Sequence, residues 1–199
     1  MDWTGNENSI YKTLGASSHT DKEREVNDYY ATDPNAIDVL FSADEFGETV
    51  WECACGEGHL SIRMEELGKK VISTDLIDRG YGKGGIDFLK SKAQNLSMDI
   101  ITNPPYKYAT DFIYKAMEIL EPGRKAAMFL KLLFLESQER KRLFTLFPPK
   151  VLYVSSSRIM CAKNADFDGM KAGGGSAVAY GWFVWEAGYA GDTTIKWVN

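Results

Sequence analysis

Residues 103–106 read Asn-Pro-Pro-Tyr and directly follow the segment 98–102, which is typical of a short apolar strand. The two prolines fix two φ angles and remove two backbone donors, so the turn is stiff and its carbonyls have no donors beside them. The Asn103 amide next to such carbonyls forms a small acceptor cluster that would fit a planar amino group. Tyr106 offers a flat ring on which a planar substrate could stack. The alternative is an ordinary proline-rich turn after a strand.

A second motif lies upstream, where the apolar segment 49–52 leads into a Gly56-x-Gly58 turn and then an amphipathic segment. Glycines at these positions let the backbone turn sharply and approach a ligand closely. A nicotinamide-type fingerprint would have a third glycine where Ser61 stands, and the Gly-Lys-Ser/Thr of a P-loop is absent. Glu52 places a carboxylate at this loop, which would repel a pyrophosphate and suit a cationic ligand.

Two further acids follow the glycine loop. Asp75 ends the segment 70–75, which we predict to be a second strand. A carboxylate at the tip of a second strand, roughly 20 residues past the glycines, is well placed to accept hydrogen bonds from ribose hydroxyls. Asp87 and Phe88 follow a glycine-rich crossing, and this pair of an acid and an aromatic ring suits an adenine amine and ring face.

In this order the motifs resemble those of class I S-adenosylmethionine-dependent methyltransferases, over about residues 28–187. The Asn-Pro-Pro-Tyr turn resembles the branch that methylates amino groups, chiefly DNA adenine-N6 methyltransferases. The segment 29–34 is similar to an extra cofactor-contacting motif found in many DNA-acting members. Short strings near 51–52, 73–76 and 182–185 are similar to small methyltransferases carried by bacteriophages and prophages. Cys53 departs from those relatives, which usually have proline there, and this should loosen the loop slightly.

The resemblance implies S-adenosylmethionine as the cofactor and methyl transfer to the exocyclic amine of adenine in DNA as the reaction. The implied cofactor contacts are Tyr30, Thr32, Glu52, Ala54, Gly56, Gly58, Asp75, Leu76, Asp87, Phe88 and Asn103. The implied catalytic residues are Asn103, Pro104, Pro105 and Tyr106. Hydrogen bonds from the amine to the Asn103 side chain and the Pro104 carbonyl would localise and aim its lone pair, while Tyr106 stacks on a flipped base. This scheme requires no dedicated general base.

Other acceptors share the same chemistry. The amine of RNA adenine and the side-chain amide of a protein glutamine are also planar NH₂ groups, although release-factor glutamine methyltransferases usually have a separate helical N-terminal domain, for which the polar residues 1–27 are too few. Cytosine is a weaker alternative, because that chemistry more often uses a serine in place of Asn103. From a different class, the chain could be a non-catalytic cofactor-binding or anti-restriction module.

Strand-like and helix-like segments alternate along the chain, which predicts an α/β fold. We expect a doubly wound, mostly parallel seven-stranded sheet with helices on both faces, a Rossmann-like methyltransferase fold whose last strand is antiparallel. The expected strands are 49–52, 70–75, a short third strand at 85–88, 98–102, 126–130, 151–154 and 177–185. The expected helices are 33–41, 59–68, 110–120 and 133–147. Ligands should bind beyond the carboxyl ends of the strands.

The length of 199 residues suits one domain with a sizeable core. We expect residues 1–27 to form a polar, flexible arm and 28–199 a single methyltransferase domain without a separate target-recognition domain. Only 155–176 lies outside the expected elements, and its glycine-rich part, 163–176, is either a hairpin connection or a loop that closes on substrate. Target recognition is therefore minimal, or a protein partner or a second copy in a homodimer supplies it.

The formal net charge of −5 is unusual for a nucleic-acid-binding protein. The candidate substrate contacts are the positive residues Lys107, Arg140, Lys141, Arg142 and Lys150, with a solvated helix face as the alternative for the run 140–142. Three cysteines and two histidines do not suggest a metal site, and we expect buried thiols in a reducing compartment. With neither an apolar run of membrane-spanning length nor a signal peptide, the expected location is cytoplasmic, away from membranes.

Overall fold

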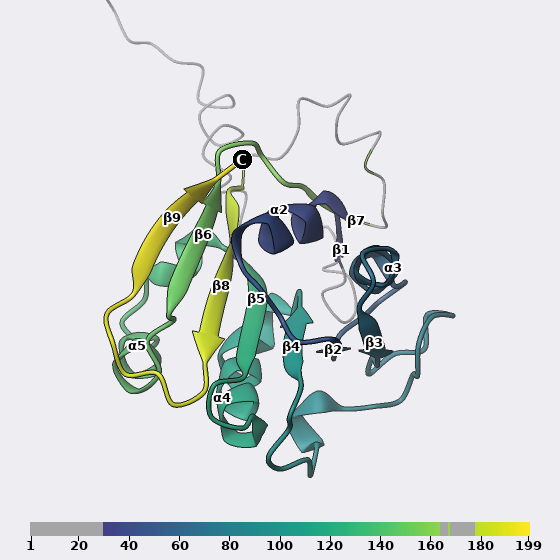
Figure 1. The fold of residues 1–199 in the computed structure, drawn as a ribbon, viewed down its shortest axis with the longest axis horizontal. Coiled ribbons are helices and arrows are strands. Elements are labelled where there is room, and N and C mark those ends of the chain that lie inside the picture. Colours follow the sequence, from purple (N-terminus) through teal and green to yellow (C-terminus); the bar gives the residue numbers. More distant parts are fainter. Residues whose placement is uncertain (1–29, 164–166, 168–177) are drawn as a thin grey trace, which may run out of the picture.

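The computed structural model describes residues 30–163, 167 and 178–199 (Figure 1). The arm expected at 1–27 lies outside these residues, as does most of the loop 163–176, so the structure tests neither prediction. No helix in the described part of the chain is long and apolar enough to cross a bilayer.

Seven strands form one sheet in the order β3-β2-β4-β5-β8-β6-β9. Their bounds are β2 Thr49–Glu52, β3 Lys70–Ser73, β4 Asp99–Thr102, β5 Lys125–Lys131, β6 Val151–Ser155, β8 Tyr180–Glu186 and β9 Thr194–Val198. Neighbouring strands are parallel, except that β8 is antiparallel to both β5 and β6. The predicted doubly wound, mostly parallel sheet is therefore confirmed, and β8 is its antiparallel strand.

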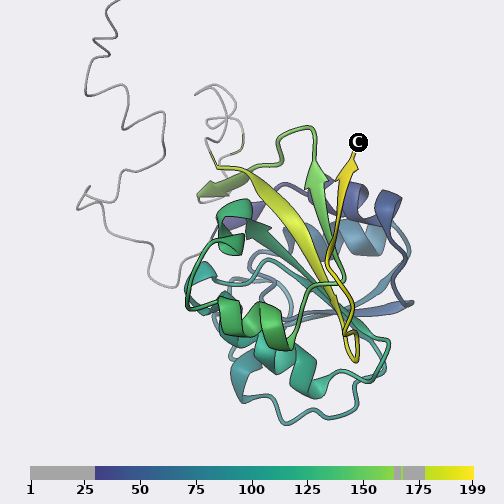
Figure 2. The ribbon, with the colours of Figure 1, turned by 90° about the vertical axis from the view of Figure 1, so that its left-hand side faces the viewer.

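Helices cover both faces of the sheet (Figures 1 and 2). They are α2 Asn35–Ala43 and α3 His59–Glu66 on one face, and α4 Ala109–Ile119 and α5 Lys141–Leu146 on the other. The central strand β5 shows why two helical layers form. Alternate strand residues point to opposite faces, so Met128 packs with α4 and α5 while Phe129 packs with α2 and α3. All five internal residues of β5 are buried, which is expected for a strand covered on both sides.

Two predicted elements are wrong in detail. The short third strand expected at 85–88 is not a strand: Gly85 has a φ of 73°, and the Asp87 side chain caps the 3-10 helix η1, Phe88–Lys90. The single helix expected at 133–147 is two pieces, the 3-10 helix η3, Leu132–Leu135, and α5. Between them the Ser137 hydroxyl accepts a hydrogen bond from the Glu139 N–H, a local bond that competes with helix formation.

Three strands were not predicted. The edge strand β9 supplies the seventh strand of the sheet in place of the expected third strand. Strands β1, Tyr30–Thr32, and β7, Cys161–Lys163, pair with each other in a separate antiparallel ribbon. Part of the segment 155–176, expected to lie outside regular structure, is therefore β7. This ribbon brings residues far apart in sequence to the edge of the sheet where β4 ends.

Candidate active site

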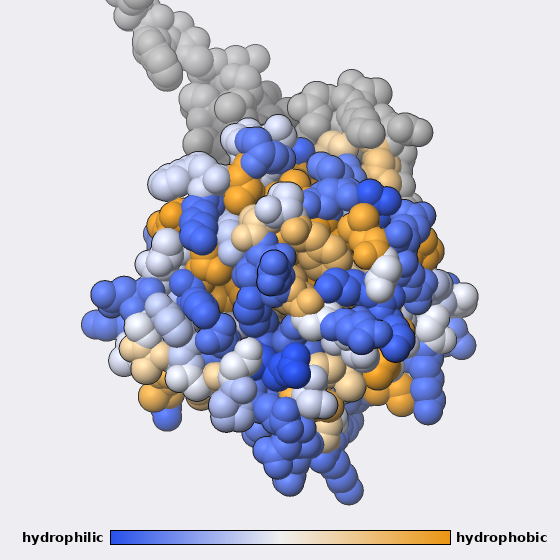
Figure 3. All heavy atoms as spheres, in the orientation of Figure 1, coloured by the Kyte–Doolittle hydropathy of each residue, from blue (hydrophilic) through white to orange (hydrophobic). Residues whose placement is uncertain are grey.

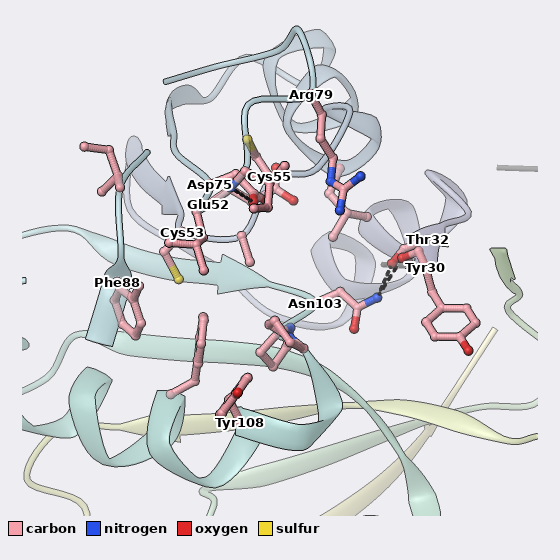
Figure 4. A pocket seen from close by; sticks show the side chains of 18 of the residues that line it. Tyr30, Thr32, Glu52, Cys53, Cys55, Asp75, Arg79, Phe88, Asn103 and Tyr108 are labelled. Atoms are coloured by element: carbon pink, nitrogen blue, oxygen red, sulfur yellow. Dashed lines mark hydrogen bonds between the residues drawn. The ribbon is translucent and has the colours of Figure 1, made fainter. Parts of the chain in front are cut away.

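A cavity of about 340 Å³ lies at the carboxyl ends of β2, β3 and β4 (Figure 4). Its walls combine the glycine loop, the segment from β3 to η1, the ribbon strand β1 and the turn after β4. The residues that line it are Tyr30, Ala31, Thr32, Glu52, Cys53, Ala54, Cys55, His59, Leu60, Asp75, Leu76, Ile77, Arg79, Ile86, Asp87, Phe88, Leu89, Asn103, Pro104, Pro105, Tyr106, Tyr108 and Phe112. The structure thus brings together every predicted cofactor and catalytic residue except the two loop glycines.

The loop glycines act through backbone shape. Gly56 and Gly58 have φ angles of 56° and 86°, a left-handed region that side chains disfavour. The Gly56 N–H donates a hydrogen bond of 2.8 Å to the Asp75 carboxylate, which ties the loop to the end of β3. At Gly58, an added Cβ would lie 2.4 Å from the Tyr81 ring, so glycine is needed there for that ring to pack on the loop.

Glu52 ends β2 and is almost fully buried. The Ser61 hydroxyl donates to its carboxyl, and the hydroxyls of Ser61 and Ser73 lie 2.7 Å apart. Burial raises the pKa of Glu52 to about 8, although the bonds from Ser61 oppose this shift. Glu52 is therefore mostly protonated at neutral pH in the protein alone, and a cationic group placed beside it would favour the carboxylate. In the sequence, Ser61 stood out only because it replaces the third glycine of a dinucleotide fingerprint. In the structure, its hydroxyl binds the Glu52 carboxyl.

Asp75 lies just beyond β3 and uses both carboxylate oxygens. One accepts from the Gly56 N–H and the other from the Ile77 N–H at 2.9 Å. Each carboxylate oxygen has a further lone pair, so Asp75 can still accept hydrogen bonds from a ligand in the cavity. Leu76, next to it, lines the cavity with an exposed side chain and offers an apolar surface there.

Asp87 and Phe88 do not lie at the end of a strand, as the sequence predicted, but at the start of η1. Asp87 accepts from the Leu89 N–H at 3.0 Å and pairs with the exposed Lys90 ammonium. Phe88 is 2% exposed and packs edge-on against Trp51 and at a tilt against Phe112. Phe88 is therefore a core residue whose ring also forms part of the cavity wall.

Asn103 follows β4 directly and is held by the β1–β7 ribbon. Its amide nitrogen donates to the Thr32 hydroxyl at 2.8 Å and to the Tyr30 carbonyl at 3.4 Å. A backbone carbonyl can only accept, so the amide nitrogen must face Tyr30. The amide oxygen of Asn103 then points away from Thr32 (Figure 4) and is buried without a hydrogen-bond partner among the described residues. Buried acceptors are rarely left unpaired, so this oxygen is a candidate ligand contact.

The prolines complete the acceptor turn. The Pro105 carbonyl accepts from the Tyr108 N–H at 2.8 Å, within the 3-10 helix η2, Tyr106–Tyr108. The neighbouring Pro104 carbonyl accepts no hydrogen bond from the described residues. Two open acceptors, the Asn103 side chain and the Pro104 carbonyl, therefore follow one another in the sequence, both in residues that line the cavity.

Tyr106 belongs to an aromatic group at the same edge. Its ring centroid lies 6.3 Å from that of Tyr30 and 6.0 Å from that of Tyr180, both tilted by about 30°. Its hydroxyl donates to the Cys161 thiol at 3.4 Å, and the Lys131 ammonium lies 4.8 Å from its ring centroid. Burial raises the pKa of Tyr106 well above its usual range and that of Cys161 to about 11, so both groups stay protonated at neutral pH.

The positively charged residues predicted to bind substrate do not line the cavity. Lys107 lies on η2, next in sequence to the cavity residue Tyr106, whereas Lys141 and Arg142 are exposed on α5. The Arg140 guanidinium donates to the Phe134 and Glu136 carbonyls at 2.7 and 2.8 Å, which anchors the segment after η3. Lys150 precedes β6, at the amino end of a strand parallel to β5, and is therefore at the opposite edge of the sheet from Asn103.

Several residues near the site were not singled out from the sequence. Arg79 and His59 line the cavity, and Cys161, Tyr180 and Lys131 surround Tyr106. Lys131 had a usable signal, because it ends an apolar strand that neighbours β4. Cys161 had none, since its contact with Thr32 joins residues 129 positions apart. The described residues contain no group of three or more His, Cys, Asp or Glu side chains that could hold a metal ion.

In comparisons with known proteins, no family model and no curated sequence matches this chain. Solved structures do. A protein described as a class I S-adenosylmethionine-dependent methyltransferase from Listeria monocytogenes has a TM-score of 0.59 at 10% identity, over 95% of this chain and 71% of that one. The modification subunit of a type I restriction enzyme from Vibrio vulnificus, so described, has a TM-score of 0.55 at 15% identity, over 94% of this chain and 48% of that one. A protein described as an RNA methyltransferase from Pyrococcus horikoshii has a TM-score of 0.53 at 18% identity, over 90% of this chain and 98% of that one.

The chain has the class I methyltransferase fold. At these identities the likeness concerns the fold, and the predicted Rossmann-like methyltransferase fold is confirmed. The narrower resemblance to the Asn-Pro-Pro-Tyr branch and to phage enzymes stays a prediction. Within the methyltransferase fold, the cavity at the carboxyl ends of β2, β3 and β4 occupies the edge where doubly wound sheets bind ligands.

Proposed function

We propose that this protein transfers a methyl group from S-adenosylmethionine to the exocyclic amine of adenine in DNA. The observation that carries the proposal is the buried, unpaired amide oxygen of Asn103 in the wall of the cavity. An acceptor held in place without a partner fits a ligand that brings an N–H donor. The open Pro104 carbonyl beside it suits the second N–H of the same amino group.

The cavity fits the proposed cofactor in size and chemistry. Its volume of about 340 Å³ lies within the ~300–1,000 Å³ typical of small-molecule sites. S-adenosylmethionine, when bound, supplies a methyl group attached to a positively charged sulfur, which makes that methyl electrophilic. Asp75 would accept hydrogen bonds from the ribose hydroxyls, Glu52 would face the cationic end of the ligand, and Leu76 and Phe88 would contact its adenine.

The roles of the turn residues follow from their bonds. Asn103, with its nitrogen bound to Thr32 and Tyr30, would accept a hydrogen bond from the target amine through its oxygen and draw electron density onto the amine nitrogen. The Pro104 carbonyl would accept the other N–H. Tyr106 would present its ring to the base. Catalysis would then come from positioning and from acceptors already in place, without a dedicated general base.

DNA is the preferred acceptor on two grounds. The turn resembles that of DNA adenine-N6 methyltransferases, and one structure with the same fold is described as the modification subunit of a restriction enzyme. A structure of the same fold is also described as an RNA methyltransferase, so RNA belongs in any test. The same two acceptors would accept a glutamine amide, which makes a glutamine-containing protein substrate the second alternative.

The test is a transfer assay with methyl-labelled S-adenosylmethionine and separate DNA, RNA and protein acceptors. Labelled nucleosides are then separated by chromatography, and calorimetry measures cofactor binding in parallel. We expect N6-methyladenine from DNA, and Asn103→Ala should lose at least ~10²-fold in turnover, the scale of one lost transition-state hydrogen bond, while still binding the cofactor.

Other outcomes of this assay are equally informative. Label in RNA or in glutamine alone would keep the chemistry and reject DNA as the substrate. Cofactor binding without transfer to any acceptor would favour the non-catalytic or anti-restriction module. Absence of cofactor binding would overturn the proposal as a whole.

A further inference from the structure

Two lysine ammonium groups lie over tyrosine rings of the turn that carries Asn103. The Lys131 Nζ is 4.8 Å from the centroid of the Tyr106 ring, and the Lys107 Nζ is 5.1 Å from that of Tyr108. Lys131 is the last residue of β5, and Tyr106 and Tyr108 belong to η2. β5 pairs with β4 in parallel, so Lys131 emerges at the same edge of the sheet as the proposed catalytic turn.

These two lysines differ from those that are ion-paired in the described part of the chain. Lys115, Lys125 and Lys150 each form an ion pair with a carboxylate, at 2.9, 2.6 and 2.6 Å respectively. No carboxylate of the described residues lies within ion-pair distance of Lys107 or Lys131. A tyrosine ring attracts an ammonium group only weakly and does not neutralise its charge. The ammonium of Lys131 therefore keeps its capacity to bind an anion.

The surroundings of Lys131 make it more than a solvated surface charge. Its side chain is partly buried, and its strand partner across the ladder is Tyr180, whose ring also contacts Tyr106. The Tyr106 hydroxyl is held by Cys161 at 3.4 Å, so the ring under the ammonium is fixed from its far end. This arrangement directs one positive charge to the place where Tyr106 would meet an acceptor base.

We propose that Lys131 binds a phosphate of the nucleotide whose base enters the site, with Lys107 contacting a neighbouring phosphate. The inference rests on the proposed function and narrows its substrate class to a nucleic acid. A glutamine side chain would supply no anion to these two charges, whereas every nucleotide in a strand does. DNA and RNA both supply such phosphates. The nucleic acid whose affinity and KM change more in the Lys131→Met protein is therefore identified as the substrate.

The experiment measures how oligonucleotide affinity and KM depend on salt for Lys131→Met, which keeps the length of the side chain and removes its charge. Lys131→Arg tests whether a positive charge alone restores binding. Lys196→Met is the matched control, because the Lys196 ammonium also lies over a tyrosine ring, 5.9 Å from that of Tyr153, but on the outer strand β9. All proteins are assayed with adenine-containing DNA and RNA oligonucleotides and with calorimetric titration of the cofactor.

Lys131→Met should raise the KM for the preferred oligonucleotide about tenfold, the scale of one charge-assisted contact. It should also reduce the log–log salt slope of binding by about 0.9 on duplex DNA, or about 0.7 on a single strand. Lys131→Arg should restore most of the parent's KM and most of its salt slope. Neither variant should change cofactor affinity. A Lys131→Met protein that matches Lys196→Met in salt slope and KM, while the parent methylates adenine, overturns this inference alone. A parent that methylates no nucleic acid overturns the proposed function instead.

Discussion

The direction of the Asn103 amide is decided by its neighbours. An asparagine after a strand could point either end of its amide into the cavity. The Tyr30 carbonyl, which can only accept, decides between the two orientations, and the Thr32 hydroxyl adds the shorter bond to the amide nitrogen. Both belong to β1, which in turn pairs with β7. A residue predicted as a cofactor contact, Thr32, is therefore placed to act through Asn103 as a positioning residue.

Thr32→Val tests this role, because valine has the same shape and cannot accept a hydrogen bond. The amide nitrogen would keep the longer contacts, to the Tyr30 carbonyl at 3.4 Å and to the Cys161 thiol at 3.8 Å, so its orientation should become less strict. We expect kcat to fall about tenfold with unchanged cofactor affinity, and Thr32→Ser to restore kcat. If the calorimetric Kd for the cofactor rises and kcat does not fall, Thr32 is a direct cofactor contact and does not position Asn103.

The buried Glu52 carboxyl should make stability depend on pH. The folded pKa of about 8 lies above the ordinary value of 4.5, so the folded protein holds this proton more tightly than the unfolded chain does. The contribution is complete below about pH 4.5 and is lost as pH rises through 8, with a slope of at most ~1.4 kcal/mol per pH unit for one proton.

Urea unfolding at pH 5, 6, 7 and 8 measures this dependence. The parent should lose stability with each step, whereas Glu52→Gln, which can still accept from Ser61, should show a nearly flat profile. Among the described residues no other raised pKa falls in this window, since those of Cys55 and Cys161, for example, are about 12 and 11. A parent profile as flat as that of Glu52→Gln would mean that Glu52 is ionised in the folded protein.

At the level of helices, strands and loops, the glycine loop depends on its contact with the segment that follows β3. Gly58→Ala meets two obstacles, the φ of 86° and the Tyr81 ring at 2.4 Å. Gly68 is a matched control, because it has a φ of 85° and no atom within 4 Å of an added Cβ. Gly68→Ala should therefore lose only the backbone contribution, ~1–2 kcal/mol.

Gly58→Ala should lose at least ~1 kcal/mol more than Gly68→Ala in urea unfolding, since the ring must move. In a Tyr81→Ala background the two glycine substitutions should have equal effects. Unequal effects in that background would show that Gly58 is required for a reason other than the Tyr81 ring, such as the course of the loop towards the cavity.

The elements predicted correctly are those with a strong local pattern. The apolar segments 49–52 and 98–102 became β2 and β4, and the helical spacing from 110 to 120 became α4, so the strand ends that carry Glu52 and Asn103 could be placed from sequence. The strands β1 and β7, which were not predicted, depend on pairing between distant segments of the chain. β1 and β7 have three residues each, too few for a periodic pattern, and exist because they pair with each other. The third strand was expected at 85–88 after a glycine-rich crossing, and it is absent because Gly85 has a left-handed φ of 73° and Asp87 caps η1.

For the molecule as a whole, the two ends of the parallel strands carry different chemistry. Hydrophilic residues cover most of the face shown in Figure 3, so neither this surface nor the net charge of −5 indicates where a polyanion would bind. The strand directions indicate where a polyanion would bind. The cavity, Asn103 and Lys131 lie at the carboxyl ends, whereas Lys150 lies at the amino end of β6, which is on the same side of the sheet as the amino end of β5.

Lys150→Met should therefore leave nucleic-acid binding unchanged, contrary to the expectation that Lys150 contacts substrate. Its ammonium is paired with Glu186 at 2.6 Å, and this partly exposed pair should contribute at most ~1 kcal/mol to folding. The measurement is the salt slope of oligonucleotide affinity, with Lys131→Met as the positive comparison. If Lys150→Met reduces the slope by about 0.9, a phosphate reaches the amino ends of the strands. The nucleic acid would then wrap around the molecule, and Lys150 would have to leave Glu186 to meet it.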